Sequence, residues 1–305
     1  MAGKPVVITG LSDLMFTKGI WTLEKLKTSI GSKTVVPRKR VEHSRDWANL
    51  EDSQAIKVVD FITQIQSTES KEYLFDWNLP DNAPDLCSEL NIPVYFADDY
   101  LQHLPEGSLY RDAWPSLFIG PEGSRSGLHV DTFGSNFWMA LMEGTKHWRM
   151  YDKDDCHLLG PTYTSSLDPH FAAEMFLAGD KEVGDHCAMQ ARGWDFHLEA
   201  GEVLFVPAGC PHAVDNVTLT VAISANFVDS SNIQRSLEEL GVSSSEDVRS
   251  LAVRNGLQRV VEMKAEKNIT CLQSLGSKKV IPWKEFKVSN NLETSDEDRS
   301  KKQRL

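Results

Sequence analysis

The spacing of apolar and polar residues predicts a β-rich middle region, flanked by an α/β beginning and an α-helical end. From about Trp114 onward, short apolar or alternating runs are separated by Gly, Pro and Asp, which is typical of a β-sandwich or barrel. The predicted strands of this region are Ser116–Ile119, Asn136–Met142, His147–Tyr151, Trp194–Leu198, Val203–Val206 and Thr218–Phe227. An insertion of mixed composition between Cys156 and Arg192, with a short helix predicted near Pro169–Leu177, is interpreted as a binding loop.

The N-terminal part mixes strands with amphipathic helices. Thr22 is a predicted N-cap, and Gly31 stands just past the end of the same helix. The predicted elements are strands at Pro5–Thr9 and Tyr73–Trp77, helices at Trp21–Ile30 and Ala55–Ile65, and a mostly loop stretch at Asn78–Asn91.

The C-terminal part changes to helical spacing after Phe227. Ser231–Leu240 predicts a helix that ends at Gly241, and Ser243-x-x-Glu246 is a capping-box signature for a second helix through Val261. The polar stretch Ser289–Leu305 shows no periodicity and is predicted to be disordered. We therefore expect a flanking segment 1–113 packed on the barrel, a β domain 114–229 with its insertion at 156–192, a helical segment 230–288 and a tail 289–305.

Composition narrows the class of protein. The 305 residues are 41% hydrophobic, which is ordinary for a globular chain with a sizeable core. The net charge of −12 argues against a broad nucleic-acid-binding surface and suits basic peptide partners. No signal peptide or membrane-spanning run is visible, and five widely spaced cysteines without a CxxC motif are interpreted as reduced thiols. We expect an intracellular location, cytoplasmic or nuclear.

Two motifs carry the candidate chemistry. In Gly-Leu-His129-Val-Asp131 the two polar side chains share one face of an extended chain, so they can bind the same metal. By itself such a pair is more often a surface feature. Far along the chain, Gly201 to Pro207 predicts a turn and a buried strand, and the tight turn that follows delivers His212 to the start of the next strand. Two imidazoles and one carboxylate form the facial ligand set of non-haem Fe(II), which leaves coordination positions open.

Lys146 supplies a second test of this interpretation. A dicarboxylic cosubstrate that chelates Fe(II) through its keto-acid end needs a cation for its distal carboxylate. Lys146 follows the turn Glu143-Gly144-Thr145, shortly after the His-x-Asp motif. If it is buried, an ammonium would be costly without such a partner. The alternative is a solvated turn lysine.

Ser126 to Trp148 and Gly201 to Phe227 resemble the JmjC domain of 2-oxoglutarate oxygenases. They contain that family's His-x-Asp, its Gly-x-Lys-x-Trp, its Gly-(Glu/Asp)-x-x-Phe-(Ile/Val)-Pro and its distal histidine. The resemblance extends over about Lys4 to Asp229. It is greatest to the small single-domain hydroxylases of the arginine demethylase/lysyl hydroxylase type, and the chain shows no PHD, Tudor or zinc-finger module.

The resemblance implies a mainly β fold, a double-stranded β-helix of the jelly-roll or cupin type, with an N-terminal α/β flank and C-terminal helices. It implies Fe(II) at one mouth of the barrel, 2-oxoglutarate beside it and O₂ as cosubstrate. Carried over by residue, it makes His129, Asp131 and His212 the iron ligands, and pairs Lys146 with the distal carboxylate of 2-oxoglutarate. The other cosubstrate residues it implies are Ser126, Tyr73, Ser224 and Asn226.

The chain departs from the family pattern at two places. Many members carry an asparagine near the iron where this chain has Met139, and Asn136 points elsewhere if its strand is regular. Cys210-Pro211 replaces a bulky aromatic pair, and Cys210 is interpreted as a small buried residue. A zinc site from Cys156-His157 and His186-Cys187 is not expected, because adjacent residues cannot easily both bind one ion.

The predicted function is hydroxylation, or N-demethylation with release of formaldehyde, of a protein side chain, Lys or Arg, in a partner of basic character. Two alternatives stay open. One is a catalytically silent JmjC fold that binds a partner through the insertion and the C-terminal helices. The other is a cupin dioxygenase or isomerase that does not use 2-oxoglutarate. The sequence leaves the oligomeric state open, including a homodimer through the C-terminal helices.

Overall fold

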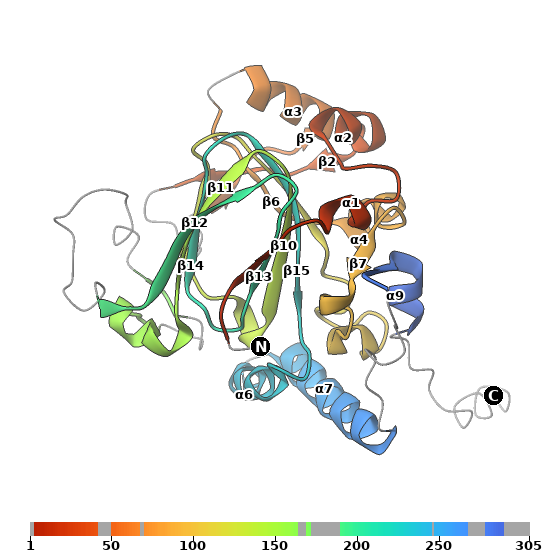
Figure 1. The fold of residues 1–305 in the computed structure, drawn as a ribbon, viewed down its shortest axis with the longest axis vertical. Coiled ribbons are helices and arrows are strands. Elements are labelled where there is room, and N and C mark those ends of the chain that lie inside the picture. Colours follow the sequence, from red (N-terminus) through yellow and green to blue (C-terminus); the bar gives the residue numbers. More distant parts are fainter. Residues whose placement is uncertain are drawn as a thin grey trace, which may run out of the picture.

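The computed structural model describes residues 3–41, 50–67, 70–163, 169–171, 190–245, 247–267 and 278–289. Two antiparallel sheets face each other and form the double-stranded β-helix expected from the sequence (Figure 1). In order, the larger sheet contains β1 (Val6–Ile8), β13 (Val203–Val206), β10 (Asn136–Glu143), β15 (Thr220–Phe227), β8 (Ser116–Gly120) and β6 (Leu74–Asn78). The smaller sheet contains β12 (Gly193–Glu199), β11 (Thr145–Tyr151), β14 (His212–Asn216) and β9 (Arg125–His129).

The strand β10 shows why the large sheet is so apolar. Successive side chains of a strand point to opposite faces. Met139 and Leu141 pack in the core between the two sheets, whereas Trp138 and Ala140 pack in a second core on the outer face. Because both faces are covered, β10 is buried along almost its whole length and does not alternate between apolar and polar residues.

Helices and short strands cover the outer face of the large sheet and the ends of the barrel. Figure 1 shows α2 and α3 at one end, with α6 and α7 at the opposite end. The helices are α1 (Ser12–Met15), α2 (Leu23–Ile30), α3 (Val58–Ser67), α4 (Leu79–Asn82), α5 (Pro84–Cys87), α6 (Ile233–Ser243), α7 (Val248–Lys267) and α9 (Trp283–Ser289). The short strands are β2 (Thr34–Val35), β3 (Arg38–Arg40), β4 (Leu50–Asp52), β5 (Ile56–Lys57), β7 (Asn91–Pro93) and β16 (Val280–Pro282). The 3₁₀ segments are η1 (Val94–Phe96), η2 (Tyr100–His103), η3 (Thr132–Gly134) and η4 (Lys153–Leu159).

Three predicted elements need correction in the flanks. The helix expected from Ala55 begins only at Val58, because Ile56 and Lys57 pair with β2. The expected loop from Asn78 contains two helical turns, and the Asn78 side chain caps the first of them by accepting from the backbone N–H of Asp81. The N-cap at Thr22 is confirmed, since its hydroxyl accepts from the Lys25 N–H.

The third correction concerns the C-terminal helices. Gly241 lies inside α6, which continues to Ser243, so Ser243 cannot cap the next helix. Instead the carboxylate of Asp247 accepts from the Arg249 N–H at the start of α7.

Some predictions lie wholly or partly outside the described residues. They concern most of the 156–192 insertion with its helix, Glu246, the second Cys-His pair and the tail beyond 289. The division into four segments stays a prediction, although β1 and β6 of the first segment belong to the large sheet of the barrel. Among the described helices, none is long and apolar enough to cross a membrane.

Candidate active site

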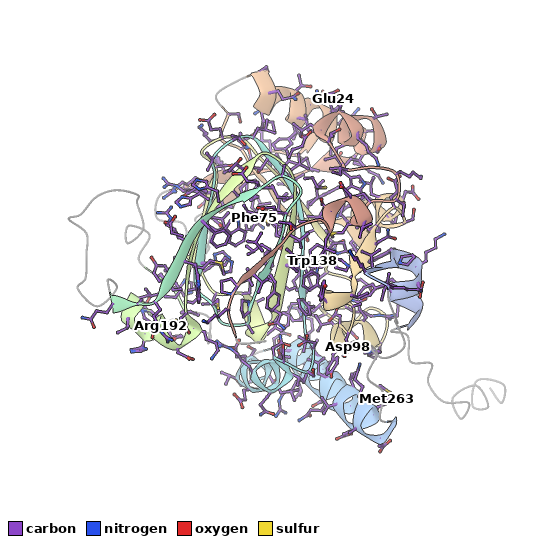
Figure 2. All side chains as sticks on the ribbon, viewed as in Figure 1. Glu24, Phe75, Asp98, Trp138, Arg192 and Met263 are labelled. Atoms are coloured by element: carbon purple, nitrogen blue, oxygen red, sulfur yellow. The ribbon has the colours of Figure 1, made fainter. Side chains whose placement is uncertain are left out.

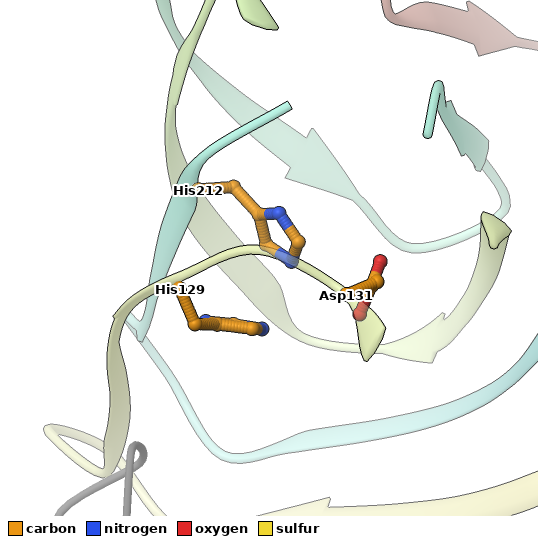
Figure 3. A group of neighbouring side chains, drawn as sticks. All are labelled: His129, Asp131 and His212. Carbon is orange, nitrogen blue, oxygen red and sulfur yellow. The ribbon is translucent and has the colours of Figure 1, made fainter. Parts of the chain in front are cut away.

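Antiparallel pairing of two strands brings the predicted ligands together. His129 ends β9, His212 begins β14, and the two residues are direct partners in the small sheet. Asp131 follows β9 and precedes the segment η3. One ligand atom from each of the three residues lies within 4.8 Å of the others, and Figure 3 shows the side chains directed at one common space. Among the described residues this is the only group of three or more such side chains that could hold a metal ion.

Backbone carbonyls orient both imidazoles. Nδ1 of His129 lies 2.8 Å from the carbonyl oxygen of Gly127, and Nδ1 of His212 lies 3.0 Å from that of Cys210. A hydrogen bond to a carbonyl requires Nδ1 to carry the hydrogen, which leaves Nε2 with its lone pair for a metal. Burial and the neighbouring His212 lower the pKa of His129 well below its usual value, so His129 stays neutral and ready to act as a ligand.

The surroundings of His212 are apolar. The ring of Trp148 lies 5.6 Å from the His212 ring, and that of Phe137 lies 6.2 Å from it. Cys210 is buried, and burial raises the pKa of its thiol to about 11. A thiol in that state is a poor nucleophile, which agrees with its interpretation as a small packing residue.

Lys146 is fully buried on β11. Its Nζ donates to Oδ1 of Asn216 at 2.6 Å and to the hydroxyl of Tyr73 at 3.3 Å. No acidic side chain pairs with it among the described residues, and burial lowers its pKa to about 7. The expectation of a solvated turn lysine is therefore wrong for this residue, which is buried beside two neutral hydrogen-bond partners.

Asn216 is a site residue that the sequence motifs did not reveal. Its Oδ1 accepts from Lys146 and from the Thr220 hydroxyl, while its Nδ2 donates to Ser124 at 2.7 Å. Asn216 faces Lys146 across the β11–β14 pair, so only the strand register could have identified it. The asparagine holds the ammonium in place without neutralising it.

The remaining predicted residues line the same cavity. Ser224 is buried, and its hydroxyl has no hydrogen-bond partner among the described residues, as expected for a group that awaits a ligand. Asn226 donates to the Ser135 hydroxyl at 2.8 Å. The cavity is lined by all eight predicted site residues and by seven others: Phe75, Asp76, Phe118, Phe137, Met139, Trp148 and Val214.

Met139 faces the cavity, as the strand phase predicted. Met139 pairs with Ser224 across the β10–β15 ladder and lines the cavity. Asn136 points elsewhere: its Oδ1 accepts from the Ala208 N–H at 3.0 Å, and its Nδ2 donates to the Ser231 hydroxyl at 3.1 Å. Asn136 thus fixes the turn before His212 and does not contact the cavity.

Comparison with known proteins places the chain in a family. Residues 1–233 match the family described as a cupin-like domain, so the chain belongs to that family. The arginine-specific demethylase JMJ22 of Arabidopsis thaliana is 33% identical over 55% of this chain and 33% of its own length. The 2-oxoglutarate and iron-dependent oxygenase JMJD4 of Danio rerio is 30% identical over 53% of this chain and 37% of its own.

A third relative is matched over more of this chain. The bifunctional arginine demethylase and lysyl-hydroxylase psr-1 of Caenorhabditis elegans is 24% identical over 75% of this chain and 56% of its own length. The chain thus spans between a third and somewhat more than half of these three relatives.

Proposed function

We propose that this protein is an Fe(II)- and 2-oxoglutarate-dependent oxygenase that hydroxylates, or N-demethylates, a Lys or Arg side chain of a protein in the cell. When bound, the iron and cosubstrate supply the oxidising chemistry: 2-oxoglutarate and O₂ yield succinate and CO₂, and one oxygen atom enters a substrate C–H bond. On an N-methyl carbon, the hydroxylated product loses formaldehyde and leaves the demethylated nitrogen. The names of the relatives include both lysyl hydroxylase and arginine demethylase.

The buried ammonium of Lys146 is the observation that carries this proposal. A metal site alone is compatible with many cupin enzymes. Lys146 lies in the same cavity as the His129–Asp131–His212 group and has no acidic partner among the described residues. A ligand with a metal-chelating end and a distal carboxylate satisfies both features at once.

The chain's own residues divide the work of binding. His129, Asp131 and His212 would hold the metal through Nε2 of each imidazole and a carboxylate oxygen. Lys146, held by Asn216 and with the Tyr73 hydroxyl beside it, would bind the distal carboxylate. Ser126, Ser224 and Asn226 offer further hydrogen bonds along the cavity wall. The aromatic side chains at the cavity wall exclude water from the reacting centre.

Two alternatives are separated by one substitution each. In a cupin enzyme that does not use 2-oxoglutarate, Lys146→Ala leaves activity intact, whereas in a 2-oxoglutarate oxygenase it abolishes turnover. A catalytically silent fold releases no succinate with or without His129. The test of the oxygenase is succinate release from 2-oxoglutarate with Fe(II) and ascorbate, read beside 2-oxoglutarate binding to the metal-loaded protein. Neither alternative releases succinate, and the effect of Lys146→Ala on a cupin enzyme of the other kind would be read on that enzyme's own substrate.

A further inference from the structure

A β-bulge in β6 turns two consecutive side chains into the cavity. Leu74 pairs with Ile119, and Trp77 pairs with Leu117. Trp77 is three residues after Leu74, but the two partners on β8 are only two residues apart, so β6 contains one extra residue. Leu74 and Trp77 both pack in the outer core. Phe75 and Asp76, the two residues between them, both line the active-site cavity. Figure 2 shows Phe75 among the strands of the barrel.

The backbone at Asp76 is strained. Its φ is +55°, in the left-handed region that side chains other than glycine and asparagine or aspartate rarely adopt. Bulges and positive φ angles cost free energy, and they persist next to active sites where they re-aim a side chain. A regular strand here would send Asp76 to the outer, apolar face of the sheet.

The Asp76 carboxylate is available to a ligand. The residue keeps solvent-exposed surface, and no salt bridge joins it to another described residue. Protein atoms around the Asp76 carboxyl displace water from it, and this desolvation raises the pKa of Asp76. The nearby Ser116 hydroxyl and the charge of Arg38 lower the same pKa. Arg38 forms its own salt bridge with Asp52 at 3.2 Å. A carboxylate in these surroundings is stabilised by an incoming cation.

The charge of Asp76 points to the substrate and not to the cosubstrate. The proposed cosubstrate is a dianion, which a carboxylate repels. The walls beside Asp76 are aromatic, with the rings of Phe75 and Phe118 packed edge to face at 5.1 Å. Apolar walls with one carboxylate suit a side chain that has an apolar stem and a cationic end, which describes Lys and Arg.

We propose that Asp76 binds the cationic end of the substrate side chain and thereby selects a Lys or Arg residue for this cavity. This inference rests on the proposed function, since it takes the cavity to be the site of substrate oxidation. It assigns the recognition of positive charge to one residue on the bulge of β6.

The test uses the full chain loaded with Mn(II), which does not turn over, and 2-oxoglutarate. The probes are the peptides Ala-Gly-Lys-Gly-Ala and Ala-Gly-Arg-Gly-Ala, with a norleucine peptide as the uncharged match. Of the lysine and arginine peptides, we expect the one with the higher affinity to bind at least about tenfold more tightly than the norleucine peptide. Asp76→Asn and Asp76→Gly, which both tolerate the positive φ, should abolish this preference. As the control, Asp60→Asn removes an equal charge from the exposed start of α3 and should leave the preference for a cationic peptide unchanged.

Three results would overturn the proposal: no preference for a cation in the wild type, a preference that survives in Asp76→Asn, or a loss of 2-oxoglutarate affinity in Asp76→Asn that equals the loss of peptide affinity. The last would assign Asp76 to the cosubstrate. Failure of the proposed function has a different signature, because there the wild type itself does not bind 2-oxoglutarate. The peptide preference is then measured on the protein with Mn(II) alone, which tests the role of Asp76 without 2-oxoglutarate.

Discussion

At the scale of single residues, the burial of Lys146 lowers the stability of the ligand-free protein. Its pKa of about 7, against an ordinary value of 10.5, means that the folded state disfavours the charged ammonium. The unfolded chain therefore binds more protons between these two values, and the penalty is largest below pH 7. Under the proposed function, the distal carboxylate of 2-oxoglutarate offsets this cost.

Lys146→Met should make the ligand-free protein more stable while abolishing 2-oxoglutarate binding. The expected gain at pH 7 is on the order of 4 kcal/mol, because no ammonium is buried and Oδ1 of Asn216 keeps its bond from Thr220. The gain should shrink as pH rises from 7 towards 10, because unfolding of the wild type takes up a proton in this range and rising pH therefore makes the wild type harder to unfold. Urea denaturation across this range measures it. A less stable Lys146→Met protein at pH 7 would show that the lysine is a structural residue.

The affinity for 2-oxoglutarate should fall above pH 7. The carboxylate binds the ammonium, and the fraction of free protein that carries it falls about tenfold per pH unit above the pKa of about 7. Titrations of the Mn(II)-loaded protein from pH 6 to 9 measure this dependence. In Lys146→Arg the side chain stays charged, so the remaining affinity for 2-oxoglutarate should not decrease between pH 7 and 9. A flat profile in the wild type would contradict the assignment of Lys146.

At the scale of elements, α6 contacts the two turns next to the candidate metal ligands. Gly134 follows Asp131 and Gly209 precedes His212, and both have positive φ angles of +63° and +81°. The Arg235 side chain of α6 lies so close to both glycines that a Cβ at either would collide with it. Asn232 and Ser236 add hydrogen bonds to the Gly134 carbonyl at 2.9 and 3.1 Å.

Arg235→Ala should weaken metal binding by about tenfold, as loss of a group that supports metal ligands typically does. Mn(II) or Co(II) titration of the variant measures this affinity. Arg249→Ala on α7 removes the same kind of side chain from an exposed position and serves as the control. Equal metal affinity in the Arg235→Ala variant and the wild type would mean that α6 covers the barrel without positioning its ligands.

Elements with strong local signals were predictable, whereas contacts between elements were predictable only where a family motif marked both residues, as for His129 and His212. Val203–Val206 was predicted to the residue, and Thr22 was identified as a cap, because apolar runs and hydroxyl caps act locally. Ile56 was assigned to a helix because its pairing with β2 depends on a partner distant in the sequence. Asn216 and Asp76 were missed for the same reason: one requires the register of β11 with β14, and the other requires a bulge that no sequence motif marks.

At the scale of the whole molecule, the acidic surface should assist a basic substrate. A net charge of −12 attracts a cationic peptide, and salt screens that attraction over about 8 Å at physiological ionic strength. We expect the KM for a basic peptide substrate to rise several-fold between low salt and 0.5 M salt while kcat changes little. A KM that does not respond to salt would confine recognition to contacts within the cavity.

The most direct measurement is succinate formation from 2-oxoglutarate by the purified protein with Fe(II) and ascorbate, beside His129→Ala and Lys146→Ala. We predict turnover in the wild type that is lost in both variants, with 2-oxoglutarate binding lost in Lys146→Ala. Turnover that survives Lys146→Ala would show that 2-oxoglutarate is not bound as proposed. Neither turnover nor 2-oxoglutarate binding in the metal-loaded wild type would contradict an oxygenase and leave a protein that acts by binding a partner.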